Sequence, residues 1–171
     1  MRRVRYRVAA SLDGFIAGLH GEHDWIVADP DIDFAAIFAQ FDTLLVGRRT
    51  FETMVAAGQA SVPGVKIFVF SRTLRQEDYP EVTIVADRAG ELVAALKKHP
   101  GKDIWLFGGG SLFRSLAELG LVDTVEVVIE PVLLGQGVPL LPASTNRIKL
   151  SLAGHKIYGS GMVSLEYQVT H

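Results

Sequence analysis

Three short segments of the chain combine glycine, hydroxyl or arginine residues with the start of a helical pattern, an arrangement suited to binding phosphate. The first is Gly108-Gly109-Gly110-Ser111, which follows the apolar run at residues 104–107. Glycines let a backbone approach a phosphate closely, and a helix N-terminus offers unpaired N–H groups and a partial positive charge. The triplet is not a complete dinucleotide-binding or P-loop motif, so a tight turn that binds nothing is the alternative.

Two further segments repeat this layout. Gly47-Arg48-Arg49-Thr50 follows an apolar run, and its arginines oppose the dipole of the expected helix unless an anion lies there. Ser71-Arg72 follows the strand-like residues 66–70. Taken singly, a solvated arginine pair and a surface turn explain these two segments. Three such strand ends on one edge of a sheet favour a ligand with several phosphates, such as a dinucleotide.

Such an edge requires parallel strands that alternate with helices. β-Branched and aromatic runs predict strands, and apolar residues at helical spacing predict helices. The two patterns alternate as far as residue 119, after which only strands follow. The expected strands cover residues 4–8, 43–46, 66–70, 82–85, 104–107, 125–129, 148–152 and 162–169, and the expected helices cover residues 31–41, 48–55, 91–98 and 111–119.

These elements predict a three-layer α/β domain. Alternating strands and helices imply a mixed, mostly parallel sheet with right-handed crossovers and helices on both faces, and the closing strands imply an antiparallel C-terminal part. Ligands of such sheets bind beyond the carboxyl ends of the parallel strands, where the three segments would lie. Arg3, Arg5 and Arg7 alternate with apolar residues on the first strand, so we expect them to be solvated or at a sheet edge.

Composition limits the class of protein. The chain has 171 residues, 49% of them apolar, a net charge of −2 and no cysteine. That length fits one domain over residues 1–171, and the missing cysteines exclude disulfides, thiolate metal sites and a catalytic thiol. Near-balanced charge argues against a nucleic-acid partner, and apolar runs of about ten residues are too short to span a membrane. No signal-peptide pattern is present, so a cytoplasmic location is expected.

Several motifs resemble, in order and spacing, the dihydrofolate reductase superfamily. They are Ser-Leu-Asp-Gly-Phe-Ile-Ala at residues 11–17, Asp24-Trp25, and residues 46–51, 71–74 and 108–112. Gly120-Leu121-Val122-Asp123, followed by the Glu-Pro-Val-Leu-Leu-Gly run at residues 130–135, narrows the resemblance to the reductase domain of the bacterial bifunctional deaminase-reductase of riboflavin synthesis. The resemblance covers essentially the whole chain, and it implies a dihydrofolate reductase-like fold and a homodimer.

The resemblance also implies NADPH as the hydride donor. Arginines near a ribose phosphate favour NADPH over NADH on electrostatic grounds as well. The implied cofactor-binding residues are Ala10 and Ile16 at the nicotinamide; Gly47, Arg48, Arg49 and Thr50 at the pyrophosphate and the 2′-phosphate side; Ser71 and Arg72 at the 2′-phosphate; and Gly108, Gly109, Gly110, Ser111 and Leu112 at the pyrophosphate.

The implied activity is hydride transfer to a pyrimidine- or pteridine-like heterocycle, with 5-amino-6-(5-phosphoribosylamino)uracil as the favoured substrate. The chain departs from the riboflavin enzymes in two respects. In the riboflavin enzymes, an Asp-x-Pro-x-Leu-x-x-Arg segment contacts the substrate phosphate. Residues 48–54 stand in its place here and look more like dihydrofolate reductase. The zinc deaminase half is missing. A dihydrofolate reductase and a non-catalytic NADP-binding module are therefore kept as alternatives.

Two carboxylates are candidates for assisting the reduction of a C=N bond, which requires a proton. Asp31 lies at the separation from Gly47 at which dihydrofolate reductases carry an acid. Its alternative role is to complement the dipole of a helix as a first-turn acid. Glu130 is the second candidate because it ends a strand at the edge where the ligand is predicted to bind. The alternative is that Glu130 is only a strand-end residue positioned by Pro131.

The predicted substrate-binding residues are Trp25, Asp31 and Phe34. For Trp25, anchoring the loop that follows the first strand is an equally good interpretation. His20 and His23 do not have the spacing of a known zinc motif, so no metal site is expected.

Overall fold

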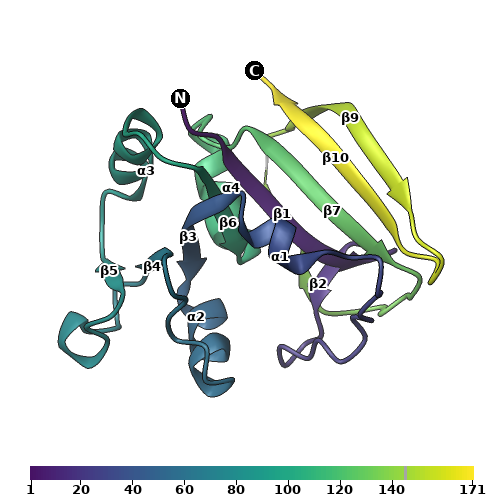
Figure 1. The fold of residues 1–171 in the computed structure, drawn as a ribbon, viewed down its shortest axis with the longest axis horizontal. Coiled ribbons are helices and arrows are strands. Elements are labelled where there is room, and N and C mark those ends of the chain that lie inside the picture. Colours follow the sequence, from purple (N-terminus) through teal and green to yellow (C-terminus); the bar gives the residue numbers. More distant parts are fainter. Residues whose placement is uncertain (145) are drawn as a thin grey trace.

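An eight-stranded sheet forms the centre of the computed structural model, which describes residues 1–144 and 146–171. Its strands are β1 (Val4–Ser11), β3 (Phe41–Gly47), β4 (Lys66–Phe70), β5 (Thr83–Val85), β6 (Asp103–Gly108), β7 (Thr124–Glu130), β9 (Lys149–Ile157) and β10 (Val163–Thr170). They lie in the order β5-β4-β3-β6-β1-β7-β10-β9 (Figure 1). The first six are parallel, and β10 is antiparallel to both of its neighbours.

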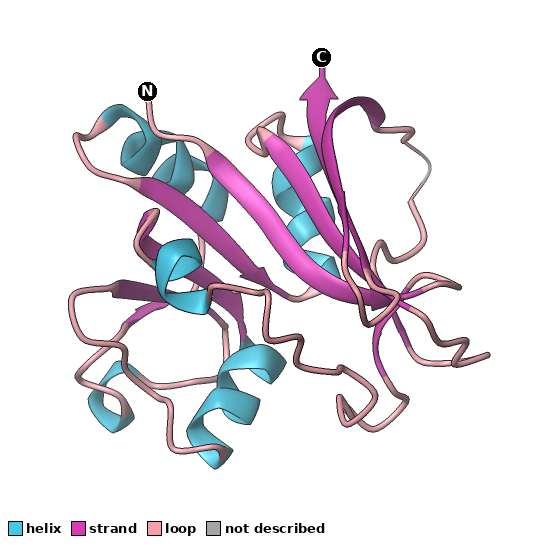
Figure 2. Ribbon diagram, turned by 45° about the vertical axis from the view of Figure 1, so that its right-hand side comes forward, coloured by secondary structure: helices cyan, strands magenta, loops and turns pink. Residues whose placement is uncertain are grey.

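Helices cover both faces of this sheet (Figure 2). They are α1 (Phe34–Phe38), α2 (Arg48–Ala56), α3 (Ala89–Lys98) and α4 (Gly110–Glu118), with a short 3-10 helix at Gln76–Asp78. Leu44 and Leu45 are adjacent on β3 and therefore point to opposite faces. Leu45 belongs to a core cluster with Phe113 of α4, whereas Leu44 belongs to a second cluster with Phe51 of α2. The predicted three-layer fold class is confirmed.

A second sheet is not predicted by the sequence patterns. It pairs β2 (Phe15–Ala17) with β8 (Val138–Pro139), and both strands are too short to show an alternating pattern. The backbone N–H of Leu140 donates to the carbonyl of Gly14 at 2.9 Å, which fixes the turn before β2. Within the described residues, no helix has the length and apolar character needed to cross a membrane.

The first helix is much shorter than expected. The pattern predicts a helix over residues 31–41, but α1 has only 5 residues, none of them buried. The Asp33 carboxylate caps its start by accepting a hydrogen bond from the Ala36 backbone N–H at 2.9 Å. Phe41 already belongs to β3 and is buried, so the strand takes over the last apolar residue of the pattern.

The prediction for the arginines of the first strand is wrong for Arg5 and Arg7, whereas Arg3 is exposed as predicted. Strand β1 lies in the centre of the sheet, and Arg5 is only 6% exposed. Its guanidinium donates to both carboxylate oxygens of Glu126 on β7, at 2.7 and 2.9 Å. Arg7, which is half-buried, donates to the same carboxylate at 2.8 Å. The carboxylate of Glu126 on the neighbouring strand allows these two cations to lie within the sheet.

The Arg5–Glu126 pair should matter for stability. Burial alone would raise the pKa of Glu126, but the hydrogen bonds and charge of Arg5 hold it below its ordinary value. Removing one partner of a buried pair leaves an uncompensated charge, so Glu126→Ala should lower the free energy of unfolding by about 3–5 kcal/mol. Denaturant unfolding measures this. The exposed Arg88–Glu91 pair is the control, and Glu91→Ala should cost less than about 1 kcal/mol. Equal losses for the two variants would contradict the prediction.

Candidate active site

Parallel strands bring the predicted phosphate-binding segments to one edge of the sheet. Strand β3 lies between β4 and β6, and β1 lies between β6 and β7, all in parallel. Their carboxyl ends therefore point the same way. The residues at these ends are Ser11, Gly47, Phe70, Gly108 and Glu130.

The starts of α2 and α4 lie side by side at this edge. Gly47 and Gly109 are the residues that precede the two helices, and neither helix has a side-chain cap. A Cβ on Gly47 would lie 3.5 Å from the Gly109 backbone nitrogen. Gly108 has a φ of 154°, and a Cβ there would lie 3.2 Å from the Thr50 hydroxyl. The peptide bond between Gly108 and Gly109 is cis. Two uncapped helix N-termini thus meet around a glycine-lined surface, which is a cradle for an anion.

The third glycine of the triplet has a packing role. Gly110 is buried, and a Cβ on it would lie 2.7 Å from the Pro139 carbonyl oxygen. The segment after β8 therefore runs directly over the first turn of α4. Ser111 is exposed on that turn, and Leu112 is half-buried against the core.

The three predicted arginines differ in what they contact. Arg48 forms an ion pair with Glu52 one helical turn away, at 3.2 Å. Arg49 and Arg72 are exposed, and neither forms an ion pair with any residue that the structure describes. Ser71 is buried, and its hydroxyl accepts hydrogen bonds from the backbone N–H groups at positions 73 and 74. Ser71 therefore builds the turn that exposes Arg72.

Glu130 is the buried carboxyl of this edge. It is 1% exposed, it lies opposite Ser11 in the β1–β7 register, and its Oε2 has no hydrogen-bond partner among the described residues. Burial raises the pKa of Glu130, and the Val27 backbone N–H offsets part of that shift. The raised pKa means that Glu130 keeps its proton to a higher pH than an exposed glutamate does, and in that form it can donate a proton.

Asp13 is a residue that the sequence analysis missed. Its carboxylate accepts hydrogen bonds from the Ser11 hydroxyl at 2.7 Å and from the backbone N–H groups of Leu134 and Gly135 at 3.1 and 2.7 Å. The hydrogen bond from Ser11 is the main reason why the pKa of Asp13 lies below its ordinary value. Asp13 thus joins the loop after β1 to the loop after β7. An Asp-Gly turn is the only local signal of this role.

Asp29, rather than Asp31, is the buried acid of the loop before α1. Its carboxylate accepts hydrogen bonds from the Asp31 backbone N–H at 2.9 Å and from the Ser160 backbone N–H at 3.3 Å. The Ser160 side chain is the main reason why the pKa of Asp29 lies below its ordinary value, and the two backbone N–H groups lower it further. The loop is thereby attached to the β9–β10 turn, beside Glu130. Asp31 itself is exposed, and its catalytic role stays a prediction.

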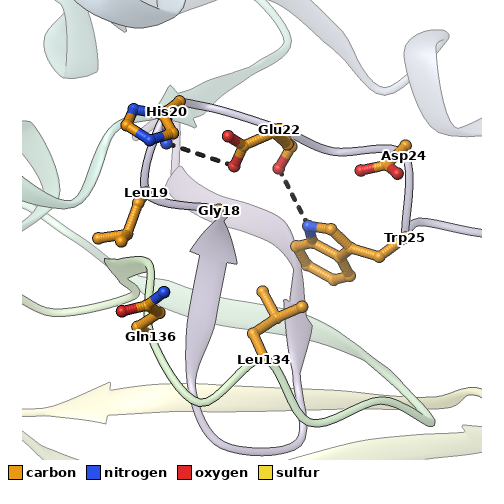
Figure 3. A pocket seen from close by; sticks show the side chains of 8 residues that line it. All are labelled: Gly18, Leu19, His20, Glu22, Asp24, Trp25, Leu134 and Gln136. Carbon is orange, nitrogen blue, oxygen red and sulfur yellow. Dashed lines mark hydrogen bonds between the residues drawn. The ribbon is translucent and has the colours of Figure 1, made fainter.

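A cavity of ≈ 400 Å³ lies between residues 18–25 and the loop after β7 (Figure 3). The Trp25 ring faces Leu134 across it, and the indole N–H of Trp25 donates to the Glu22 carbonyl at 3.0 Å. Among the other predicted residues, Phe34 is exposed on α1, Ala10 is buried at the end of β1, and Ile16 is half-buried on β2. Trp25 is thus the predicted substrate residue that lines a cavity, and Phe34 and Asp31 lie on the segment that follows it.

Comparison with known proteins agrees with this geometry. The model of the RibD C-terminal domain family matches residues 2–164. The chain belongs to this family. The chain is 39% identical to YyaP, an uncharacterized protein of Bacillus subtilis (strain 168), over 97% of its own length and 94% of the relative.

Two solved structures show the same fold. A protein of Shewanella sp. PV-4 that is described as a riboflavin biosynthesis protein superposes with a TM-score of 0.82 at 25% identity, over 100% of both chains. Dihydrofolate reductase from Enterococcus faecalis, solved with NADP(H), superposes with a TM-score of 0.73 at 17% identity, over 99% of this chain and 97% of that one. The predicted family and the dihydrofolate reductase-like fold are confirmed, and the structural neighbours include reductases.

The buried state of Glu130 predicts a pH-dependent stability. A carboxyl whose pKa is raised on folding binds more protons in the native state, so stability falls as pH rises from its ordinary value, about 4, through the raised value. Glu130→Gln removes this titration. The variant should therefore gain stability relative to the wild type as pH rises through that window, as measured by urea unfolding. A difference that is constant with pH would contradict the buried, unpartnered state of Glu130.

Proposed function

We propose that this RibD C-terminal domain protein is an NADPH-dependent reductase of a pyrimidine- or pteridine-like heterocycle. The observation that carries the proposal is the buried carboxyl of Glu130, with one oxygen unpartnered, on the edge where two uncapped helix N-termini meet. That edge thus combines an acid whose pKa is raised with a surface suited to phosphates.

The glycine cradle fits a dinucleotide. Gly47, Gly108 and Gly109 line the two helix starts without side chains, and a Cβ on Gly108 would lie 3.2 Å from the Thr50 hydroxyl. Their backbone N–H groups would hold the pyrophosphate. Arg49 and Arg72 are exposed and would pair with the adenosine 2′-phosphate side, since a guanidinium forks onto phosphate oxygens. Ala10 and Ile16, at the far end of the edge, would contact the nicotinamide.

When bound, NADPH supplies a hydride, which together with one proton reduces a C=N or C=O bond. Glu130 is suited to hold that proton because its burial favours the neutral acid. Asp31 is exposed and is the weaker candidate. Asp13 and Asp29 position the loops on either side of Glu130 through their backbone hydrogen bonds.

Two specific activities fit this chemistry. Reduction of 5-amino-6-(5-phosphoribosylamino)uracil is favoured by the family, whose name derives from riboflavin biosynthesis. Reduction of 7,8-dihydrofolate is the second candidate, and the close superposition with dihydrofolate reductase supports it. A module that binds NADP without catalysis remains the third hypothesis, and activity measurements separate it from the other two.

A homodimer through the late strands is part of the proposal. Strand β9 is an edge strand, and Leu150, Leu152 and Ile157 on it are exposed. Their register with β10 places the three side chains on one face of the hairpin. An exposed apolar stripe on an edge is suited to an isologous contact with a second copy.

The test of the proposed function follows NADPH absorbance with a panel of pyrimidine and pteridine-like heterocycles that includes both named substrates. We expect NADPH oxidation with at least one of them. Glu130→Gln should lose activity by roughly 10²–10⁴-fold, the usual contribution of a general acid. Binding of NADPH without turnover of any heterocycle would leave only the non-catalytic module.

The choice of cofactor gives a separate prediction. Arg72→Ala should weaken NADPH binding by roughly 10–100-fold, since a charge-assisted contact contributes about 1.5–3 kcal/mol, and should leave NADH binding nearly unchanged. Fluorescence titration measures both. Arg75→Ala is the matched control, because Arg75 is exposed nearby and already paired with Glu77. Equal losses for NADPH and NADH would contradict the role of Arg72 at the 2′-phosphate.

A further inference from the structure

We infer that the substrate of this site is an uncharged heterocycle, with neither a phosphate nor a carboxylate group. The inference rests on the proposed function and narrows its substrate class: of each of the two heterocycles named there, the preferred form is the one without the phosphate or the free carboxylates. It concerns the segment that begins at the end of β1 and continues through residues 18–33 to α1. We call it the covering segment because it lies over the ends of β1 and β7.

This covering segment has no lysine or arginine. Residues 11–38 contain six Asp and Glu residues. Glu22 and Asp24 of this set line the ≈ 400 Å³ cavity beside Trp25, together with His20 but with no lysine or arginine. A phosphate that lost its water there would face carboxylates without a counter-ion, which is unfavourable.

Of the three cations that flank the segment, Arg7 and Arg48 are paired with carboxylates, and Lys156 is exposed beside Asp29. Arg7 donates to Glu126 at 2.8 Å, and Arg48 pairs with Glu52 at 3.2 Å. Lys156, on the β9–β10 hairpin, lies with its Nζ 4.7 Å from the centroid of the Tyr158 ring, and its charge acts on Asp29. The free arginines, Arg49 and Arg72, belong to the phosphate side of the proposed cofactor.

The covering segment instead offers apolar side chains. Phe34 and Val27 are 54% and 55% exposed, and Ile26 and Phe38 are each 38% exposed. On helix α1, Ile37 packs against the second core cluster and Phe38 packs on Trp105. The side chain of Phe34 does not take part in these contacts and leaves apolar surface exposed. Val27 also provides the backbone N–H that faces Glu130. The apolar surface therefore adjoins the acid, where a flat uncharged ring would bury it.

Matched pairs of substrates test the inference. The two members of each pair differ in the anionic group: 5-amino-6-(5-phosphoribosylamino)uracil against its dephosphorylated ribosyl form, and 7,8-dihydrofolate against the dimethyl ester of its glutamate carboxylates. With NADPH saturating, kcat/KM should be higher for the uncharged member of the active pair by roughly tenfold or more. An equal or higher value for the anionic member would overturn the inference and leave the proposed function intact. Turnover of none of the four would contradict both.

A charge-reversal variant provides the second measurement. Asp24→Lys adds a cation to the cavity, so the ratio of kcat/KM for the anionic member to that for the uncharged member should rise severalfold. Glu81→Lys makes the same charge change on an exposed residue before β5, at the opposite edge of the sheet, and should leave the ratio unchanged. A ratio that rises equally in both variants, or in neither, would contradict the role of the covering segment.

Discussion

Strand β1 pairs in parallel with β6 on one side and with β7 on the other, and this register places the buried acid and the glycine triplet of the candidate site. It sets Ser11 opposite Glu130, and through β6 it sets the glycine triplet beside Gly47. The charged face of β1 has to be compensated for the strand to lie there. Glu126 supplies that compensation because it accepts hydrogen bonds from both Arg5 and Arg7. The buried ion pairs and the site are thus two consequences of one strand order.

The loops beyond this edge are held by carboxylates that do no chemistry themselves. Asp13 fixes the loop after β1 to the loop after β7, and Asp29 fixes the loop before α1 to the β9–β10 turn. Together they enclose Glu130, which explains how a carboxyl at a strand end loses its water. The same loops bring an acidic, partly apolar segment over the site, so under the proposed function the elements that bury the acid would also select the substrate.

Periodicity predicts most of the fold because the parallel strands are short, buried and separated by amphipathic helices. It fails where a contact from another element decides the outcome. Phe41 continues the helical pattern of residues 31–41 but is buried as part of β3. The sequence pattern predicts Arg5 to be solvated or at a sheet edge because its partner, Glu126, lies 121 positions away in the sequence. For the same reason, the type and spacing of residues suggest Glu130 as an acid, whereas its burial and the Asp13 contacts depend on loops distant in sequence.

The central claim is that a dinucleotide binds at the carboxyl edge of the parallel strands. Backbone amide chemical shifts recorded during a titration with NADP⁺ test this most directly. Saturable changes should gather at Gly47, Gly108, Ser111 and Arg72, while the second cavity, around Arg147 and Lys149 near the C-terminus, stays unchanged. The absence of saturable binding, or changes centred on that second cavity, would contradict the claim.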